Sequence, residues 1–251
     1  GGRVRRLHPG ELTGARTSRG RTLADAMEIV LIRHGEPEWV LDGLNVDNPP
    51  LTTRGRRQAE AMAAYLRDQH FDEVFCSPLR RARETAAPLF RELGRDETID
   101  PWLEEIRNPI WHGTPREKAE EAYREERARP AADRWRGLDG GEPVDSFVER
   151  IHLGVSLFLA ERGVTRTEQP LPVWRIDEPD RRIALVAHAG TNSVVICHLL
   201  GLAPTPWEWD RFVIHHGSVS RLESMEMGDG HTFSLTKLSD VEYLDPADRT
   251  R

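Results

Sequence analysis

The sequence is poor in the features on which several classes of protein depend. Only two cysteines occur in 251 residues, Cys76 and Cys197, each in an apolar stretch, which gives no disulfide framework and no cysteine-based metal spacing. No apolar run approaches the roughly 18 residues of a membrane span, and the first residues lack the hydrophobic region of a signal peptide. We therefore expect a protein of the reducing cytoplasm with no membrane partner.

An excess of positive charge is also missing. Lys and Arg number 35 against 42 Asp and Glu, which gives a formal net charge of -7. Nucleic acid is therefore not expected as a partner, and any anion site must be local. Residues 1 to 26 are basic but have no apolar period, so we interpret them as a disordered extension or a remnant of cloning rather than as a nucleic-acid-binding arm.

From Met27 onward, short apolar runs alternate with amphipathic stretches, a pattern typical of an α/β layered fold. We expect one domain over residues 27 to 245, a three-layer α/β/α sandwich with a mostly parallel central sheet. The clearest expected strands are 29 to 32, 74 to 76 and 183 to 187, and a late hairpin is expected over 219 to 225 and 232 to 236.

Two charged segments interrupt this alternation. Residues 113 to 138 are rich in Arg and Glu, and we interpret them as an exposed helical insertion over the fold. Residues 165 to 182 contain three prolines and many charges, which predicts a surface loop.

Arg33, His34 and Gly35 come directly after the first buried strand. Open α/β sheets bind ligands at the carboxyl ends of their strands. A neutral imidazole is a competent nucleophile toward phosphorus when its other nitrogen is held as a donor. Arg33 would bind phosphate oxygens and would disfavour protonation of His34.

Two later segments repeat this design. Residues 77 to 86 place arginines where a strand passes into a helix, whose first N–H groups favour an anion. His188, Ala189 and Gly190 follow the most apolar strand and precede another helix, so they present a second imidazole to the same edge of the sheet.

These three segments, with residues 50 to 59 between the first two, resemble in kind and order the histidine phosphatase superfamily, also called phosphoglycerate-mutase-like. The resemblance covers roughly residues 27 to 236. It implies a phosphomonoester hydrolase, without metal or cofactor, acting on a small phosphorylated substrate. His34 would be the phosphorylated nucleophile, and the phosphate pocket would be completed by Arg33, Arg81 and His188. Arg81 is preferred over Arg80 and Arg83 because the family's arginine directly precedes an alanine.

Two adjacent carboxylates, Glu104 and Glu105, are candidates for the general acid. The reaction needs one carboxyl that protonates the departing alkoxide and then takes a proton from the attacking water. The family pattern of Leu, any residue, then the acid selects Glu105, which leaves Glu104 as a solvated neighbour.

The sequence departs from the family pattern where the substrate's organic half would bind. Pro37 stands where the family usually has Ser or Thr, and Val40 stands where an Asn often follows the tryptophan. Asn45 or Asn48 would substitute for that Asn. His112 stands where many phosphatase members have an acidic residue before Gly, and we expect it to contact substrate, with a solvated loop histidine as the alternative. The expected substrate contacts also include Gly35 and Ala189.

Several alternatives stay open. A phosphoglycerate mutase would need basic residues for a second acidic group, and Arg107, His112 and Arg116 could supply them. A non-catalytic binder of phosphorylated ligands would not need both His34 and Glu105. Ten histidines, including the pair His215 and His216, suggest a metallohydrolase as a third hypothesis. No acidic ligands accompany these histidines in a recognisable spacing. A homodimer is left open.

Overall fold

The structure of the protein is a computed structural model, in which residues 26 to 251 are described. The basic extension expected over residues 1 to 26 lies outside the described residues, except for Ala26. Among the residues that are described, no helix is both long and apolar enough to cross a membrane.

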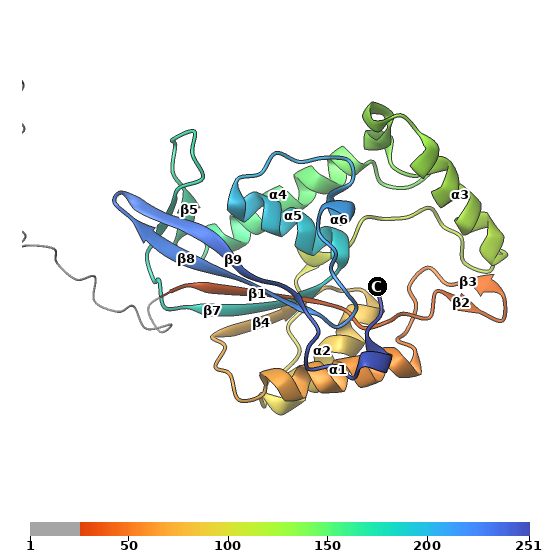
Figure 1. Ribbon diagram of the computed structural model, residues 1–251, viewed down its shortest axis with the longest axis horizontal. Helices are drawn as coiled ribbons and strands as arrows, with labels where there is room; N and C mark the ends of the chain where they lie inside the picture. The colour runs from red at the N-terminus through yellow and green to blue at the C-terminus, as the bar shows by residue number, and fades with distance from the viewer. Residues whose placement is uncertain (1–25) are drawn as a thin grey trace, which may run out of the picture.

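A seven-stranded sheet lies at the centre of the described structure, with its strands in the order β4-β7-β1-β8-β9-β6-β5 (Figure 1). The strands are β1 (Glu28–Arg33), β4 (Glu73–Cys76), β5 (Val164–Arg166), β6 (Trp174–Ile176), β7 (Arg182–Ala187), β8 (Val219–Met227) and β9 (Gly230–Asp240). β7 pairs parallel with both β1 and β4, whereas the other four pairings are antiparallel. The predicted three-layer fold is confirmed, but the predicted mostly parallel sheet is met only in part, because the late hairpin extends it with antiparallel strands.

Helices cover both faces of the sheet. Figure 1 shows α1 (Thr53–Leu66) and α2 (Arg80–Glu92) on one side, and α4 (Val144–Ala160), α5 (Ala189–Leu200) and α6 (Glu208–Arg211) on the other. Alternate residues of β1 enter two separate cores: Ile29 and Leu31 pack with α4 and α5, and Val30 and Ile32 pack with α1 and α2. A strand buried on both faces reads as a continuous apolar run, which is why β1 and β7 are legible in the sequence.

The segment from 165 to 182 is not simply a surface loop. It contains β6 and the end of the edge strand β5, which pair with each other around the turn that holds two of the prolines. Trp174 of β6 is only 2% exposed, its ring packs edge-on against Phe233, and its Nε1 donates a hydrogen bond to the carbonyl of Leu199. Burial of this indole anchors the segment, so the prediction of a loop is wrong at these strands.

The charged segment from 113 to 138 contains α3 (Arg116–Ala128) and the short 3-10 helix η3 (Ala131–Arg136). Two small strands after β1, β2 (Val40–Leu41) and β3 (Leu44–Asn45), form a hairpin that meets the start of α3 through a bridge between Leu44 and Pro115. Figure 1 shows α3 and this hairpin at the same end of the molecule, beyond the carboxyl ends of β1 and β7. The short helices η2 (Pro101–Leu103) and η4 (Pro246–Asp248) complete the elements.

Candidate active site

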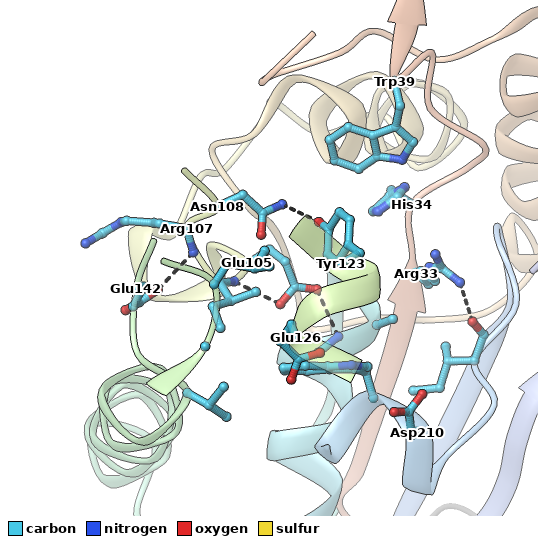
Figure 2. Close-up of a pocket in the computed structure, with 18 of the residues that line it drawn as sticks. Arg33, His34, Trp39, Glu105, Arg107, Asn108, Tyr123, Glu126, Glu142 and Asp210 are labelled. Carbon is cyan, nitrogen blue, oxygen red and sulfur yellow. Dashed lines mark hydrogen bonds between the residues drawn. The ribbon is translucent and has the colours of Figure 1, made fainter. Parts of the chain in front are cut away.

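A cavity of about 800 Å³ opens beyond the carboxyl ends of β1 and β7 (Figure 2). Its floor includes Arg33 and His34 from the end of β1 and Arg81 from the first turn of α2. Glu105 lines it from the segment that follows η2, and Ala189 from the first turn of α5. The cavity therefore brings together side chains that lie far apart in the sequence, at the edge where open α/β sheets bind ligands.

The imidazole of His34 is held in one tautomer. Its Nδ1 lies 2.7 Å from the carbonyl oxygen of Gly35, so Nδ1 carries the proton and donates it. Its Nε2 accepts a hydrogen bond from Nε of Arg81 at 3.2 Å. Burial, followed by the charges of Arg81 and other neighbours, holds the pKa of His34 well below its ordinary value. His34 is thus neutral near pH 7, with its lone pair on Nε2.

Two guanidinium groups lie beside His34, that of Arg81, which is buried, and that of Arg33, which is partly buried. Arg33 donates to the carbonyl of Ile214 at 2.5 Å and to Nε2 of His216 at 2.9 Å. Its Nε is buried and has no hydrogen-bond partner within residues 26 to 251. Burial lowers the pKa of each arginine to about 10, so both stay charged at neutral pH. A buried cationic donor left unpaired by the protein is what an anionic ligand requires.

His188 lies behind this floor and is fully buried, with its ring centroid 5.1 Å from that of His34. Its Nε2 is 2.8 Å from the hydroxyl oxygen of Ser77, which itself accepts from the backbone N–H of Leu79. When the Ser77 hydroxyl donates to Nε2, the proton of the neutral ring resides on Nδ1, which has no partner among the described residues. Burial, and then the charge of Arg81, lowers the pKa of His188.

The carboxylate of Glu105 is seated at the N-terminus of α5. Its Oε2 accepts from the backbone N–H of Gly190 at 2.9 Å, and its Oε1 from that of Ile106 at 3.0 Å. A Cβ atom on Gly190 would lie 2.5 Å from Oε1, so any larger residue there would displace the carboxylate from this position. Glu104 instead turns outward and pairs with Arg107 at 2.8 Å.

Comparison with known proteins agrees with this geometry. A model of the histidine phosphatase superfamily (branch 1) matches residues 29 to 234. This chain belongs to the histidine phosphatase superfamily. The resemblance read from the sequence motifs is thereby confirmed.

Several named relatives of this histidine phosphatase are themselves phosphatases, and one is a probable phosphoglycerate mutase of Salmonella choleraesuis, 24% identical over 227 residues, 87% of this chain and 95% of the relative. Glucosyl-3-phosphoglycerate phosphatase of Mycolicibacterium vanbaalenii is 31% identical over 185 residues, 71% of this chain and 76% of the relative. 2-carboxy-D-arabinitol-1-phosphatase of Triticum aestivum is 28% identical over 189 residues, 72% of this chain but 34% of that longer protein. A solved mycobacterial glucosyl-3-phosphoglycerate phosphatase superposes with a TM-score of 0.62 at 25% identity, covering 85% of this chain and 99% of its own. The protein is a phosphoric monoester hydrolase.

The structure separates the arginines at the start of α2 in this phosphatase. Arg81 is 4% exposed and faces His34, whereas Arg80 pairs with Glu84 and Arg83 with Glu97 on the outer surface. The preference for Arg81 in the sequence thus agrees with its position in the cavity.

Three residues expected to contact substrate are not brought to the cavity. The backbone N–H of Gly35 donates to the hydroxyl of Thr85, and Gly35 packs so closely on Gly55 that a Cβ would lie 2.5 Å from the Gly55 oxygen. Asn45 is buried, and its amide donates to the hydroxyl of Thr114 and the carbonyl of Pro115. His112 lies in an exposed turn outside the cavity.

His216 is the residue beside the phosphatase site that the sequence interpretation missed. It is 7% exposed, and its ring centroid is 5.7 Å from that of His34. Its Nε2 accepts from Arg33, and its Nδ1 donates to the hydroxyl of Thr250 at 3.0 Å. Burial, and then the charge of Arg33, lowers its pKa to about 3, which keeps Nε2 available as an acceptor. The sequence signal was its position just before a late strand that begins at Val219.

Replacing His216 with alanine is expected to lower kcat/KM for a phosphomonoester about tenfold, since one hydrogen bond that orients a charged group is worth about 1.5 kcal/mol. An asparagine there, which restores an acceptor, should recover part of the loss. His215→Ala is the matched control, because His215 bonds Ser239 rather than Arg33. Equal losses of kcat/KM in the two alanine variants would show that His216 does not act through Arg33. Steady-state kinetics and inhibition by inorganic phosphate are measured for each variant.

Proposed function

We propose that this phosphatase hydrolyses phosphomonoesters in two steps through a phosphohistidine formed on Nε2 of His34. The observation that carries the proposal is the hydrogen bonding of His34. Its proton is fixed on Nδ1 by the Gly35 carbonyl, so the nucleophilic lone pair is on Nε2, beside the guanidinium of Arg81.

In the first step, Nε2 of His34 attacks phosphorus in line with the leaving oxygen, and the P–O bond to the organic half breaks. The three non-bridging oxygens then need donors. Arg33 through its unpaired Nε, the guanidinium of Arg81, and Nδ1–H of His188 are the groups that supply them. An arriving phosphate replaces the hydrogen bond from Arg81 to His34, which frees Nε2 for attack.

Glu105 moves the proton in both steps. Its protonated form gives the proton to the departing alkoxide, so that a neutral alcohol leaves. The resulting carboxylate then takes a proton from water as that water attacks the phosphohistidine, which releases phosphate and restores both His34 and Glu105. The N–H groups of Gly190 and Ile106 stabilise the carboxylate between these events.

An activity screen in excess chelator tests the proposal. We expect release of phosphate from one or more of a set of sugar phosphates, phosphoglycerates, nucleotides and an aryl phosphate, and an acid-labile phosphoenzyme when the reaction is quenched. Activity lost to the chelator would support a metallohydrolase instead. Phosphate release only with a bisphosphorylated cofactor would support a mutase, and no activity on any compound would support a binding protein.

The mutase alternative has less support from the residues that it would need. Arg107 lines the cavity, but it already pairs with Glu104. Arg116 pairs with Glu120 on the surface of α3, and His112 lies outside the cavity. Hydrolysis is therefore the function that the site supports best.

A further inference from the structure

The cavity is far larger than a phosphate group needs. Its volume of about 800 Å³ is in the range that encloses a whole drug-sized molecule. The phosphate-binding groups occupy only the floor beside His34. The remaining space must therefore be the site of the substrate's organic half.

Apolar side chains stand exposed on the walls of this space. Trp39, Tyr123 and Val213 are 41%, 40% and 39% exposed, and all three line the cavity. Figure 2 shows the rings of Trp39 and Tyr123 projecting into the cavity, one from the loop after β1 and the other from α3. Large apolar side chains grouped in a concave site mark a surface that a ligand covers.

Both rings are held in place beside the reacting groups. The Trp39 ring centroid lies 4.8 Å from the guanidinium carbon of Arg81, which bonds His34. The Tyr123 ring packs edge-on against the buried ring of Trp111 at 5.6 Å, and its hydroxyl accepts from the amide of Asn108. Because these contacts already restrict both rings, a ligand that stacks on them causes little further loss of side-chain conformational entropy.

The helix that carries Tyr123 is itself fixed at both ends. At its start, Asn45 donates to Thr114 and to the carbonyl of Pro115. Near its end, the buried carboxylate of Glu126 pairs with Arg134 at 2.8 Å. α3 is thus tied to β3 at its start and to η3 near its end, and Asn45 anchors this wall of the cavity without lining it.

We propose that the substrate is a phosphomonoester whose organic half is bulky and presents an aromatic or apolar face to Trp39 and Tyr123. A compact, fully polar organic half would leave these rings in water. This inference rests on the proposed function, because the organic half is placed relative to a phosphoryl group beside His34.

The test compares two substrates that both release a primary alkoxide, 2-naphthylmethyl phosphate and glycerol 3-phosphate. We expect the unmodified protein to favour the naphthyl compound by about 100-fold or more in kcat/KM. Tyr123→Ala should reduce this ratio at least about tenfold, and Tyr123→Phe, which keeps the ring, should retain it. Each ratio comes from a single preparation, so it does not depend on the fraction of folded protein.

Ile110→Ala is the matched control, since Ile110 is 87% exposed in a nearby loop but does not line the cavity. It should leave the ratio unchanged. A ratio near one in the unmodified protein, or an unchanged ratio in Tyr123→Ala, would overturn the inference while leaving the proposed function intact. If the protein hydrolyses neither of these two compounds and no compound of the screen, both the inference and the proposed function are overturned.

Discussion

Replacing His34 with alanine is expected to lower phosphate release by on the order of 10⁴-fold or more, because the variant has no atom on which the phosphoenzyme can form. The same substitution should leave the fold in place. His34 is neutral and makes its hydrogen bonds to a carbonyl of its own loop and to Arg81, so no buried charge pair is broken. Phosphate release and thermal unfolding by circular dichroism measure the two effects separately.

The control for this variant is His70→Ala. His70 is mostly exposed and pairs with Asp72 at a distance from the cavity, so its loss should change neither turnover nor the acid-labile phosphoenzyme. Normal turnover in the His34 variant would refute the proposed nucleophile. If the variant both loses turnover and unfolds, the phosphoenzyme assay on the unmodified protein decides whether a phosphohistidine forms, and absence of an acid-labile phosphoenzyme there would refute it.

Glu105→Gln is expected to have the second largest effect, and the size of that effect should depend on the leaving group. With an alkyl phosphate, kcat should fall on the order of 10² to 10³-fold, because the amide cannot protonate the departing alkoxide. With p-nitrophenyl phosphate, the first step should be nearly normal, because nitrophenolate leaves without a proton. The second step still lacks its base, so a burst of nitrophenol equal to the enzyme concentration should precede slow turnover.

Glu104→Gln is the matched control for this experiment. Glu104 is the adjacent residue in the sequence, but it pairs with Arg107 and does not line the cavity. Its loss should change kcat little and give no burst. Similar losses in the two glutamine variants, or equal losses on alkyl and aryl phosphates, would contradict the assignment of Glu105 as acid and base.

The parts of the site that the sequence predicts well are those attached to buried parallel strands. β1 and β7 are apolar on both faces, so their ends, and with them Arg33, His34 and His188, are legible without a structure. The choice of Arg81 and of Glu105 depended on the resemblance to the family. Local physical chemistry alone did not distinguish Arg81 from its neighbours, because the burial that distinguishes it arises only when α2 packs against the loop of His34.

His216 was missed because β8, the strand that follows it, runs in the opposite direction to β1 and β7. The rule that ligands bind at the carboxyl ends of strands applies to the parallel strands of this sheet. β8 pairs antiparallel with β1, so the residues that precede β8 lie at the same edge as those that follow β1. Asn45 lies away from the cavity for a different reason: its contacts depend on how β3 meets the start of α3, which no sequence period records.

The walls of the cavity come from separate segments of the chain. The proposed phosphate-binding side chains come from β1, α2 and the junction of β7 with α5, whereas Tyr123 comes from residues 113 to 138. Of the two rings proposed to contact the organic half, Tyr123 therefore lies in a separate segment of the chain, whereas Trp39 lies in the loop just after His34. Substitutions within residues 113 to 138 are therefore expected to alter the preference for the organic half through Tyr123 while leaving His34, Arg81 and Glu105 in place.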